Sequence, residues 1–480
     1  MDEKNLTMLA DFYELTMLNG YLKNGMEGRI ACFDMFFRKI PDNGGFALAA
    51  GLERLIHYIK NLRFTPEDIE YLRGKKLFCG EFLEYLANFR FTCDVWAVPE
   101  GTPVFPGEPL VTVRGPVMEA QFIETMVLLA VNHQSLIATK ANRIVRAAQG
   151  REVMEFGSRR AQGSDGAVNG ARAAFIGGCT GTSCALADRD FGIPALGTMA
   201  HSWIQMFHGE LEAFRAYARV YPGSCTLLVD TYNVLKSGVP NAIKAFREEV
   251  VPKGFRPRGI RIDSGDITYL SKEARRMLDE AGFPDCRIVA SNSLDENIIR
   301  DILSQGAQVD LFGVGERLIT SKSEPVFGGV YKLVAAEENG KLEPRIKLSE
   351  NAEKITNPGL KQLWRFFDRE SGKAFADVIA LAGETMDESK PYELFDPENT
   401  WKKKKVENYC VRNLLVKIFD AGNYIYQSPA LVDIRNYCRE QVETLWDGVK
   451  RFENPHRYCV DLSGPLWELK NSMVRKYTTE

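Results

Sequence analysis

The residues best suited to chemistry stand directly after short apolar runs between positions 151 and 316. His201, one of only five histidines, follows such a run within residues 198–202. A histidine at the end of a strand can act as a base, a metal ligand or a nucleophile. Metal ligation is disfavoured because no second histidine lies three or four residues away, although His208 is two helical turns further on.

An arginine and an acid follow another apolar run. Arg261 and Asp263 are two residues apart, so their side chains point to the same side if the strand continues. Such a pair suits a phosphorylated, polyhydroxylated ligand, because the acid can accept hydroxyl protons or hold Mg²⁺ through water. A buried ion pair without catalytic meaning is the alternative.

The remaining run ends are rich in residues that bind anions. Arg159 and Arg160 follow a glycine, and arginine can pair with phosphate through its forked donors, although a surface salt bridge is the alternative. Residues 177–183 are rich in glycine and hydroxyl side chains but lack the P-loop lysine, so they form a weak anion-binding signal. Gly313 and Gly315 end the last run, where barrels often bind phosphate. Together the run ends predict an enzyme acting on a phosphorylated, sugar-like substrate.

The elements that must position these side chains are buried parallel strands. Seven apolar runs end in glycine or small polar residues, at residues 153–157, 175–178, 195–197, 226–229, 259–262, 288–290 and 309–312. Successive ends are roughly 20 to 33 residues apart, the length of a strand followed by a helix. Helical periodicity lies between the later runs, at residues 240–251, 270–281 and 295–303. The spacing predicts an α/β fold, an irregular TIM-like barrel over residues 119–326, with the reactive residues on its catalytic face.

The rest of the chain predicts an α+β sandwich domain and a C-terminal extension. Residues 1–118 contain expected helices at 7–24, 47–59 and 66–90 and expected strands at 30–38 and 93–114. The apolar region 119–150 is expected to form two helices that break near Asn132.

After the barrel, strands are expected at residues 330–335, 343–348, 362–367 and 375–382, with Asn339-Gly340 as a hairpin turn. We expect residues 327–398 to complete the N-terminal domain. Residues 399–480 then form an extension with a strand at 414–419 and a helix at 429–452.

Composition excludes several classes of protein. A net charge of -3 gives no reason to expect nucleic acid or an anionic membrane as a partner. The apolar stretch 122–131 is too short and too polar to span a bilayer, and the first residues show no signal-peptide pattern. Ten cysteines without a Cys-x-x-Cys pair indicate reduced thiols, so a cytoplasmic enzyme is expected.

Five motifs carry a resemblance to a known family, at residues 10–17, 155–160, 197–202, 261–266 and 312–315. In this order they resemble the nicotinate phosphoribosyltransferase family over nearly the whole chain. The resemblance implies that nicotinate and phosphoribosyl pyrophosphate give nicotinate mononucleotide and pyrophosphate, a step of NAD salvage. It also implies Mg²⁺ and ATP hydrolysis coupled to synthesis through a phosphohistidine.

The resemblance assigns roles to individual residues. His201 would be the phosphorylated histidine, acting with Arg261 and Asp263. Phe156 would stack on one face of the pyridine ring, and Tyr13 of a partner subunit on the other, which implies a homodimer with shared sites. Further substrate contacts would come from Arg159, Ser183, Thr198, Arg261, Asp263, Gly265, Ser293, Gly313, Gly315 and Thr320.

Within that set, Arg159 and Arg261 would contact the nicotinate carboxylate or phosphates, Asp263 the ribose hydroxyls, and Thr198 the nicotinate. Gly313, Gly315 and Thr320 would cradle the 5-phosphate, although Glu316 stands where many relatives have a small residue.

Ser183 bears on the choice between nicotinate and nicotinamide. Related nicotinamide enzymes carry an aspartate at the matching place, and a carboxylate there would repel nicotinate, whereas a hydroxyl would donate to it. Two alternatives stay open: a nicotinamide-specific enzyme, and a non-catalytic barrel used for scaffolding or ligand sensing. The second predicts the loss of some of His201, Arg261 and Asp263, and all three are present.

Overall fold

The computed structural model describes residues 5–351 and 354–478, which divide into two compact units. The central unit is Ile137–Pro325. The flanking unit consists of the described residues up to Leu136 and those from Val326 onward. The same chain therefore leaves the flanking unit at Leu136 and returns to it at Val326.

The central unit is built on a parallel sheet with the strand order β7-β6-β11-β10-β9-β8. The strands are β6 (Glu152–Glu155), β7 (Gly181–Thr182), β8 (Thr226–Leu228), β9 (Gly259–Ile262), β10 (Arg287–Ser291) and β11 (Leu311–Val314). The predicted α/β class is confirmed. Among the described residues, β7 and β8 form the two edges of the ladder, so the strands do not close into a hydrogen-bonded ring.

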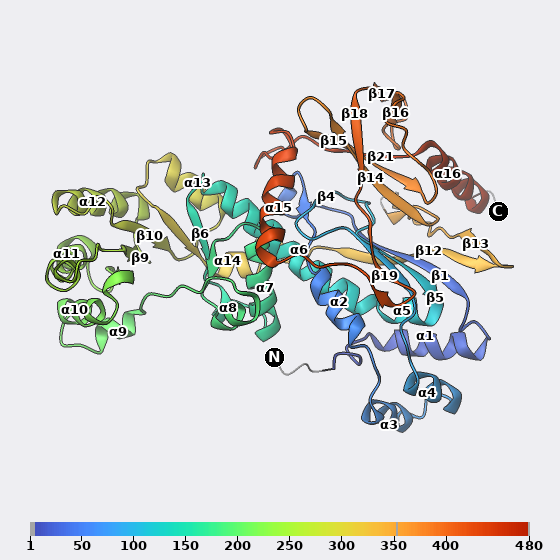
Figure 1. Cartoon of the computed structure of the whole chain (residues 1–480), viewed down its shortest axis with the longest axis horizontal. Coiled ribbons are helices and arrows are strands. Elements are labelled where there is room, and N and C mark those ends of the chain that lie inside the picture. Colours follow the sequence, from blue (N-terminus) through green and yellow to red (C-terminus); the bar gives the residue numbers. More distant parts are fainter. Residues whose placement is uncertain (1–4, 352–353, 479–480) are drawn as a thin grey trace. The chain divides into compact units, whose positions relative to one another are not determined.

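Helices follow most of these strands, as parallel connections require. They are α7 (Ser164–Ile176), α8 (Ala185–Phe191), α9 (His201–Gln205), α10 (Glu210–Val220), α11 (Val239–Ala245), α12 (Ile267–Glu280), α13 (Glu296–Ser304) and α14 (Glu316–Ile319). In Figure 1, α10, α11 and α12 lie along one side of β9 and β10. A buried apolar cluster that includes Phe214, Phe246 and Ile260 fills the space between them.

Two of the seven predicted strands are wrong. Residues 175–178 lie at the end of α7 and in the turn after it, and the strand comes later, as β7. Residues 195–197 contribute only an isolated bridge, between Thr182 and Ala195. An apolar run of three or four residues does not distinguish a buried helix end from a buried strand, and both errors have this cause.

The flanking unit contains mainly antiparallel sheets. Its largest sheet has the order β13-β12-β1-β5-β3-β19-β20, and a second has the order β18-β14-β15-β21. The strands are β1 (Ile30–Phe37), β2 (Ala47–Leu48), β3 (Asp94–Ala97), β4 (Pro103–Val104), β5 (Val111–Pro116), β12 (Gly329–Glu338), β13 (Lys341–Pro344), β14 (Lys361–Asp368), β15 (Ala374–Leu381), β16 (Tyr392–Phe395), β17 (Lys403–Val406), β18 (Tyr409–Asn413), β19 (Val416–Asp420), β20 (Asn423–Tyr424) and β21 (Cys459–Leu462). The predicted Asn339-Gly340 turn is confirmed, because both residues have the positive φ that this hairpin type requires.

The helices of this unit pack on the largest sheet or lie beside the second. They are α1 (Phe12–Lys23), α2 (Leu52–Lys60), α3 (Pro66–Gly74), α4 (Gly80–Ala87), α5 (Val117–Phe122), α6 (Glu124–Ala147), α15 (Leu431–Thr444) and α16 (Gly464–Thr478). The predicted break near Asn132 is wrong, since α5 and α6 separate at Ile123. Asn132 lies inside α6, and its side-chain oxygen accepts a hydrogen bond from Gly329 N at 3.1 Å. No described helix is long and apolar enough to cross a membrane.

Candidate functional site

A cavity of about 410 Å³ lies at the carboxyl ends of the central unit's strands. Ligands of parallel α/β sheets bind at this end, because the connecting loops gather there. Its lining residues are Phe156, Ser158, Arg159, Arg160, Ser183, Leu196, Gly197, Thr198, Arg261, Asp263, Ser291, Asn292, Ser293, Gly313, Gly315, Glu316 and Arg317. They come from the loops after β6, β7, β9, β10 and β11 and from the segment before α9.

Arg261 connects four separate segments of the cavity wall. Its Nε donates to Ser291 Oγ at 2.8 Å, and its two terminal nitrogens donate to Thr198 Oγ1 at 3.3 Å and Asp263 Oδ1 at 2.8 Å. The guanidinium carbon lies 5.8 Å from the centre of the Phe156 ring, within cation–π range. The arginine is therefore held in one orientation, with its charge facing an aromatic ring and the cavity.

Asp263 is kept ionised by its neighbours. Burial raises its pKa, but the hydrogen bond from Ser291 and the Arg261 guanidinium outweigh burial and hold the pKa below its ordinary value. Asp263 is thus a fixed carboxylate acceptor, suited to hydroxyl groups of a sugar. Ser291 bridges the pair, since its hydroxyl accepts from Arg261 and donates to Asp263.

Gly313 leaves room for the aromatic ring of Phe156. A Cβ placed on Gly313 would lie 2.4 Å from the Phe156 ring, so only glycine leaves room for this aromatic ring against β11. A Cβ on Gly315 would lie 3.0 Å from the backbone oxygen of Phe156. Gly313 in β11 and Gly315 just after it therefore leave room for Phe156. A contact between these glycines and a phosphate stays a prediction.

The cavity carries an excess of positive charge. Four arginines line it, namely Arg159, Arg160, Arg261 and Arg317, against the carboxylates of Asp263 and Glu316. Ser158 adds a hydroxyl whose oxygen is buried and has no partner among the described residues. An anionic ligand would supply a partner for this hydroxyl and for the exposed arginines.

His201 begins α9, next to the cavity. Its Nδ1 lies 3.1 Å from Thr231 Oγ1, and its Nε2 lies 3.8 Å from Asp263 Oδ2. Asp230 follows β8 and accepts from Asp263 N and Ser264 Oγ through one oxygen, while its other oxygen is buried without a partner among the described residues. The histidine thus lies beside the Asp263 carboxylate, and Asp230 contacts the loop that carries Asp263.

These carboxylates fit Mg²⁺ only in part. Within the described residues, no group of three His, Cys, Asp or Glu side chains could enclose a metal ion. Mg²⁺ is commonly held by one or two carboxylates together with substrate phosphates and water. The partnerless oxygen of Asp230 suits that arrangement, with Asp263 nearby.

The structure brings together most, but not all, of the predicted site residues. Phe156, Arg159, Ser183, Thr198, Arg261, Asp263, Ser293, Gly313 and Gly315 line the cavity. Gly265 and Thr320 are outside the lining residues, and Thr320 donates to Glu316 O at 2.8 Å. Tyr13 belongs to the flanking unit, where burial and then Glu124 raise its pKa.

Ser158, Ser291 and Asp230 were not singled out as site residues from the sequence. All three residues do stand directly after predicted strands, at the positions where the sequence predicts functional side chains. Their contacts were not predictable, because Ser291 meets Arg261 only once β9 and β10 pair side by side.

Comparisons with known proteins give a consistent result. The chain matches the N-terminal domain, family and C-terminal domain models of nicotinate phosphoribosyltransferase over residues 8–132, 151–358 and 360–470. It is similar to a nicotinate phosphoribosyltransferase of Bacillus subtilis (strain 168), with 42% identity over 478 residues that cover 99% of this chain and 96% of that protein.

Solved structures agree with the sequence matches. The crystal structure of human nicotinic acid phosphoribosyltransferase superposes with a TM-score of 0.86 at 30% identity, covering 96% of this chain and 99% of that one. A nicotinate-nucleotide pyrophosphorylase from Pyrococcus furiosus has a TM-score of 0.69 at 26% identity, covering 92% and 96%.

Proposed function

Because the chain belongs to the nicotinate phosphoribosyltransferase family, we propose that it joins nicotinate to phosphoribosyl pyrophosphate and releases pyrophosphate. The observation that carries the proposal is the arrangement around Arg261, which combines an aromatic ring, a fixed cation and a fixed carboxylate in one cavity. These are the groups that a planar aromatic acid and a phosphorylated ribose require. The product would feed NAD salvage.

Nicotinate would bind against Phe156. The pyridine ring would stack on the phenyl ring, and the guanidinium of Arg261 would lie near its carboxylate. Ser183 lines the same cavity with a hydroxyl, which can donate to a carboxylate. An acid is therefore favoured over an amide as the substrate, and the nicotinamide-specific alternative predicts the opposite preference.

The sugar substrate would use the carboxylate and the remaining arginines. Asp263 would accept hydrogen bonds from the ribose hydroxyls, while Arg159, Arg160 and Arg317 would balance the charge of the phosphate groups. The pyridine nitrogen attacks the anomeric carbon, whose bond to pyrophosphate breaks through an oxocarbenium-like state. No proton has to be abstracted, so the residues act by positioning and by balancing charge. Mg²⁺ held by Asp230, substrate phosphates and water would neutralise the leaving pyrophosphate.

ATP would act through His201. A ring nitrogen would bond to the terminal phosphorus of ATP as ADP leaves, and water would later release phosphate from the histidine. The contact with Thr231 supports this role, because it orients the imidazole beside the cavity. Phosphorylation adds negative charge next to Asp263 and the proposed metal position, which would favour binding of Mg²⁺ with pyrophosphate.

Homodimer formation is part of the proposal. Tyr13 is 45% exposed on α1, and Leu9, Phe12 and Leu129 of the same unit are also large exposed apolar residues. Such residues are suited to an interface between copies. In the proposed dimer, Tyr13 of each subunit stacks on nicotinate in its partner's site.

The test is a product assay on the purified full chain. Nicotinate with phosphoribosyl pyrophosphate should give nicotinate mononucleotide, detected by chromatography, and nicotinamide in its place should give far less product. ATP should stimulate synthesis and be hydrolysed with it. Absence of product from nicotinate, with and without ATP, would refute the proposed function.

A separate variant tests the proposed role of His201. His201→Ala should lose the ATP stimulation and the coupled ATP hydrolysis while keeping some ATP-independent synthesis. Equal stimulation by ATP in the variant and the parent would exclude a phosphohistidine at this position.

Shared sites can be tested by mixing variants. Tyr13→Ala and Arg261→Ala subunits should each have low activity, and re-formed mixed dimers should recover part of it because some contain one intact site. Recovery would support Tyr13 in the partner's site, and mixed dimers no more active than their parents would place it elsewhere.

A further inference from the structure

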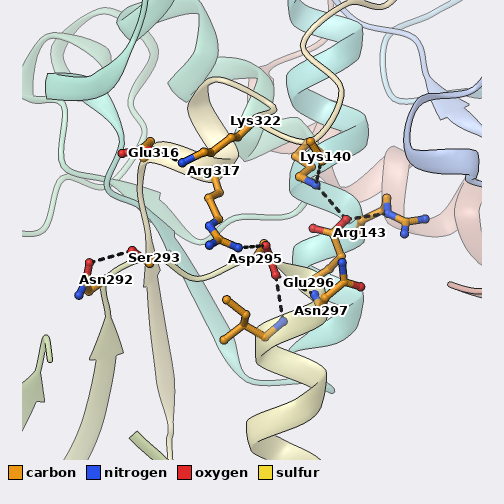
Figure 2. A network of polar contacts seen from close by, with 12 residues as sticks. Lys140, Arg143, Asn292, Ser293, Asp295, Glu296, Asn297, Glu316, Arg317 and Lys322 are labelled. Atoms are coloured by element: carbon orange, nitrogen blue, oxygen red, sulfur yellow. Dashed lines mark hydrogen bonds and ion pairs between the residues drawn. The ribbon is translucent and has the colours of Figure 1, made fainter. Parts of the chain in front are cut away.

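A buried ionic cluster stands next to the loops that line the cavity. Glu296, the first residue of α13, accepts from Lys140 Nζ at 2.9 Å and from Arg143 Nε at 3.1 Å. The three side chains are only 2%, 3% and 7% exposed, respectively. Lys140 also donates to Ser323 Oγ at 2.7 Å, so it joins the start of α13 to the segment after α14 (Figure 2).

A second contact joins the same two segments closer to the cavity. One oxygen of Asp295 accepts from Asn297 N at 3.0 Å and Ile298 N at 2.9 Å and so caps α13. Its other oxygen pairs with Arg317 of α14, one of the cavity-lining arginines, as Figure 2 shows. The orientation of Arg317 therefore depends on a residue that lies outside the cavity lining.

The loop between β10 and Asp295 is held at both ends. Asn292 and Ser293 have φ values of 82° and 52°, a left-handed conformation that non-glycine residues rarely adopt. Such a conformation is unfavourable for a non-glycine residue and persists only when its surroundings impose it. Here Ser291 is fixed on one side by Arg261 and Asp263, and Asp295 and Glu296 are fixed on the other.

Stability alone is a poor explanation for the buried cluster. Replacing buried ion pairs by apolar residues of similar volume often leaves a protein equally or more stable, because burying charges is costly. What directional ion pairs supply is a defined position for the groups that they join. In this fold, Glu296 follows the loop that contributes Asn292 and Ser293 to the cavity, and Ser323 follows the segment that contributes Arg317.

We propose that Asp295 and Glu296 are positioning residues that hold the loops after β10 and β11 as the wall that receives a phosphate group of phosphoribosyl pyrophosphate. The identity of that ligand rests on the proposed function. Arg317 contacts the phosphate directly, whereas Asp295 orients Arg317 and Glu296 anchors the start of α13.

Asp295→Asn is the sharpest variant. Asparagine caps a helix about as well as aspartate, so α13 stays capped, but a neutral amide cannot form the ion pair with Arg317. We expect the KM for phosphoribosyl pyrophosphate to rise roughly 10- to 100-fold, as displacements near an ångström do at active sites. The KM for nicotinate and the melting temperature should stay close to the parent's.

Asp266→Asn is the matched control. Asp266 follows the neighbouring strand β9 at the same end of the sheet and caps α12 through Tyr269 N at 3.0 Å. It makes no ion pair within the described part of the chain. Its replacement should leave both KM values unchanged.

Amide hydrogen exchange supplies a measurement that needs no substrate. In Asp295→Asn and in Glu296→Gln, exchange should become faster in residues 291–295 and 313–323 but not in β9. If the parent made no nicotinate mononucleotide, the proposed function would fail while this measurement still tested the positioning role.

Three results would overturn the positioning role. One is an amide exchange rate in Asp295→Asn that equals the parent's in both residues 291–295 and residues 313–323. Another is faster exchange with an unchanged KM for phosphoribosyl pyrophosphate in an active parent. The third is an equal rise of both KM values with a large fall in melting temperature, which marks a purely structural role.

Discussion

Two arginine–aspartate pairs occupy opposite environments. Arg261 and Asp263 lie two residues apart at the end of the parallel strand β9, 2.8 Å from each other and 16% and 24% exposed. Arg365 and Asp377 face each other across the antiparallel strands β14 and β15, 2.6 Å apart and fully buried. Arg365 donates to both oxygens of Asp377 through two nitrogens, whereas Arg261 makes one hydrogen bond to Asp263. Arg261 and Asp263 line a cavity that contains other reactive groups, and Arg365 and Asp377 are enclosed by protein.

The buried pair is also surrounded more completely. Arg365 lies 5.6 Å and 5.9 Å from the ring centres of Phe105 and Tyr458, and the Tyr458 hydroxyl donates to Asp377 at 3.0 Å. Burial, followed by the charge of Asp377, raises the pKa of Glu108 well above its ordinary value, which favours the neutral form of this neighbour. Arg261, by contrast, has one ring on one side and the cavity on the other. An arginine–aspartate pair indicates a functional site only when its surroundings leave room for a ligand.

The largest expected effect is on the buried pair. Arg365→Met should reduce the free energy of unfolding by about 3–5 kcal/mol, because it leaves Asp377 charged and buried without its partner. Urea unfolding measures the loss. The double variant Arg365→Met/Asp377→Asn should recover much of it, and a single variant as stable as the parent would contradict the comparison.

The pair that lines the cavity, Arg261 and Asp263, should behave in the opposite way. Arg261→Ala should reduce kcat/KM by roughly 10²–10³-fold, the usual cost of a lost charge-stabilising donor, while the urea midpoint changes little. Arg258→Ala, an exposed arginine just before β9, is the control and should retain parental kinetics. A loss of stability without a loss of activity would reverse the roles of the two pairs.

The single ring beside Arg261 allows a finer test. Gly313→Ala would place a methyl group against Phe156 and displace the ring, so the KM for nicotinate should rise roughly 2- to 10-fold, the equivalent of one aromatic stacking interaction. Gly166→Ala is a suitable control because its Cβ would only reach ordinary contact distance in α7. An unchanged KM would mean that Phe156 does not stack on the substrate.

The smallest effect concerns pH. Because the folded-state pKa of Asp263 is lowered from 3.8, its stabilising contribution is present above pH 3.8 and is lost as the pH falls through the folded-state value. Unfolding free energy of the parent should therefore fall more steeply below pH 4 than that of Asp263→Asn. Parallel curves for the two proteins would show that the pKa of Asp263 is not lowered in the fold.

The two ion pairs also differ in how far they could be predicted from the sequence. Arg261 and Asp263 were identifiable because they adjoin one another at the end of a predicted strand, and β6, β9 and β10 were expected close to where they lie. Arg365 and Asp377 meet because of the register in which β14 and β15 pair, and this register could not be predicted from the sequence. The same holds for Ser291 with Arg261 and for Asp295 with Arg317, which meet only after the order of the strands is set.

The pairing of β1 with β12 has a consequence for synthesis on the ribosome. Ala31 lies opposite Ala336, so 305 residues separate the two partners along the chain. At translation rates of about 5–20 residues per second, β1 waits roughly 15–60 s before β12 exists. The central unit is contiguous and can fold during that interval, whereas one edge of β1 stays open to other chains. We therefore expect this edge of β1 to be open to unwanted strand pairing in nascent chains until β12 has been made.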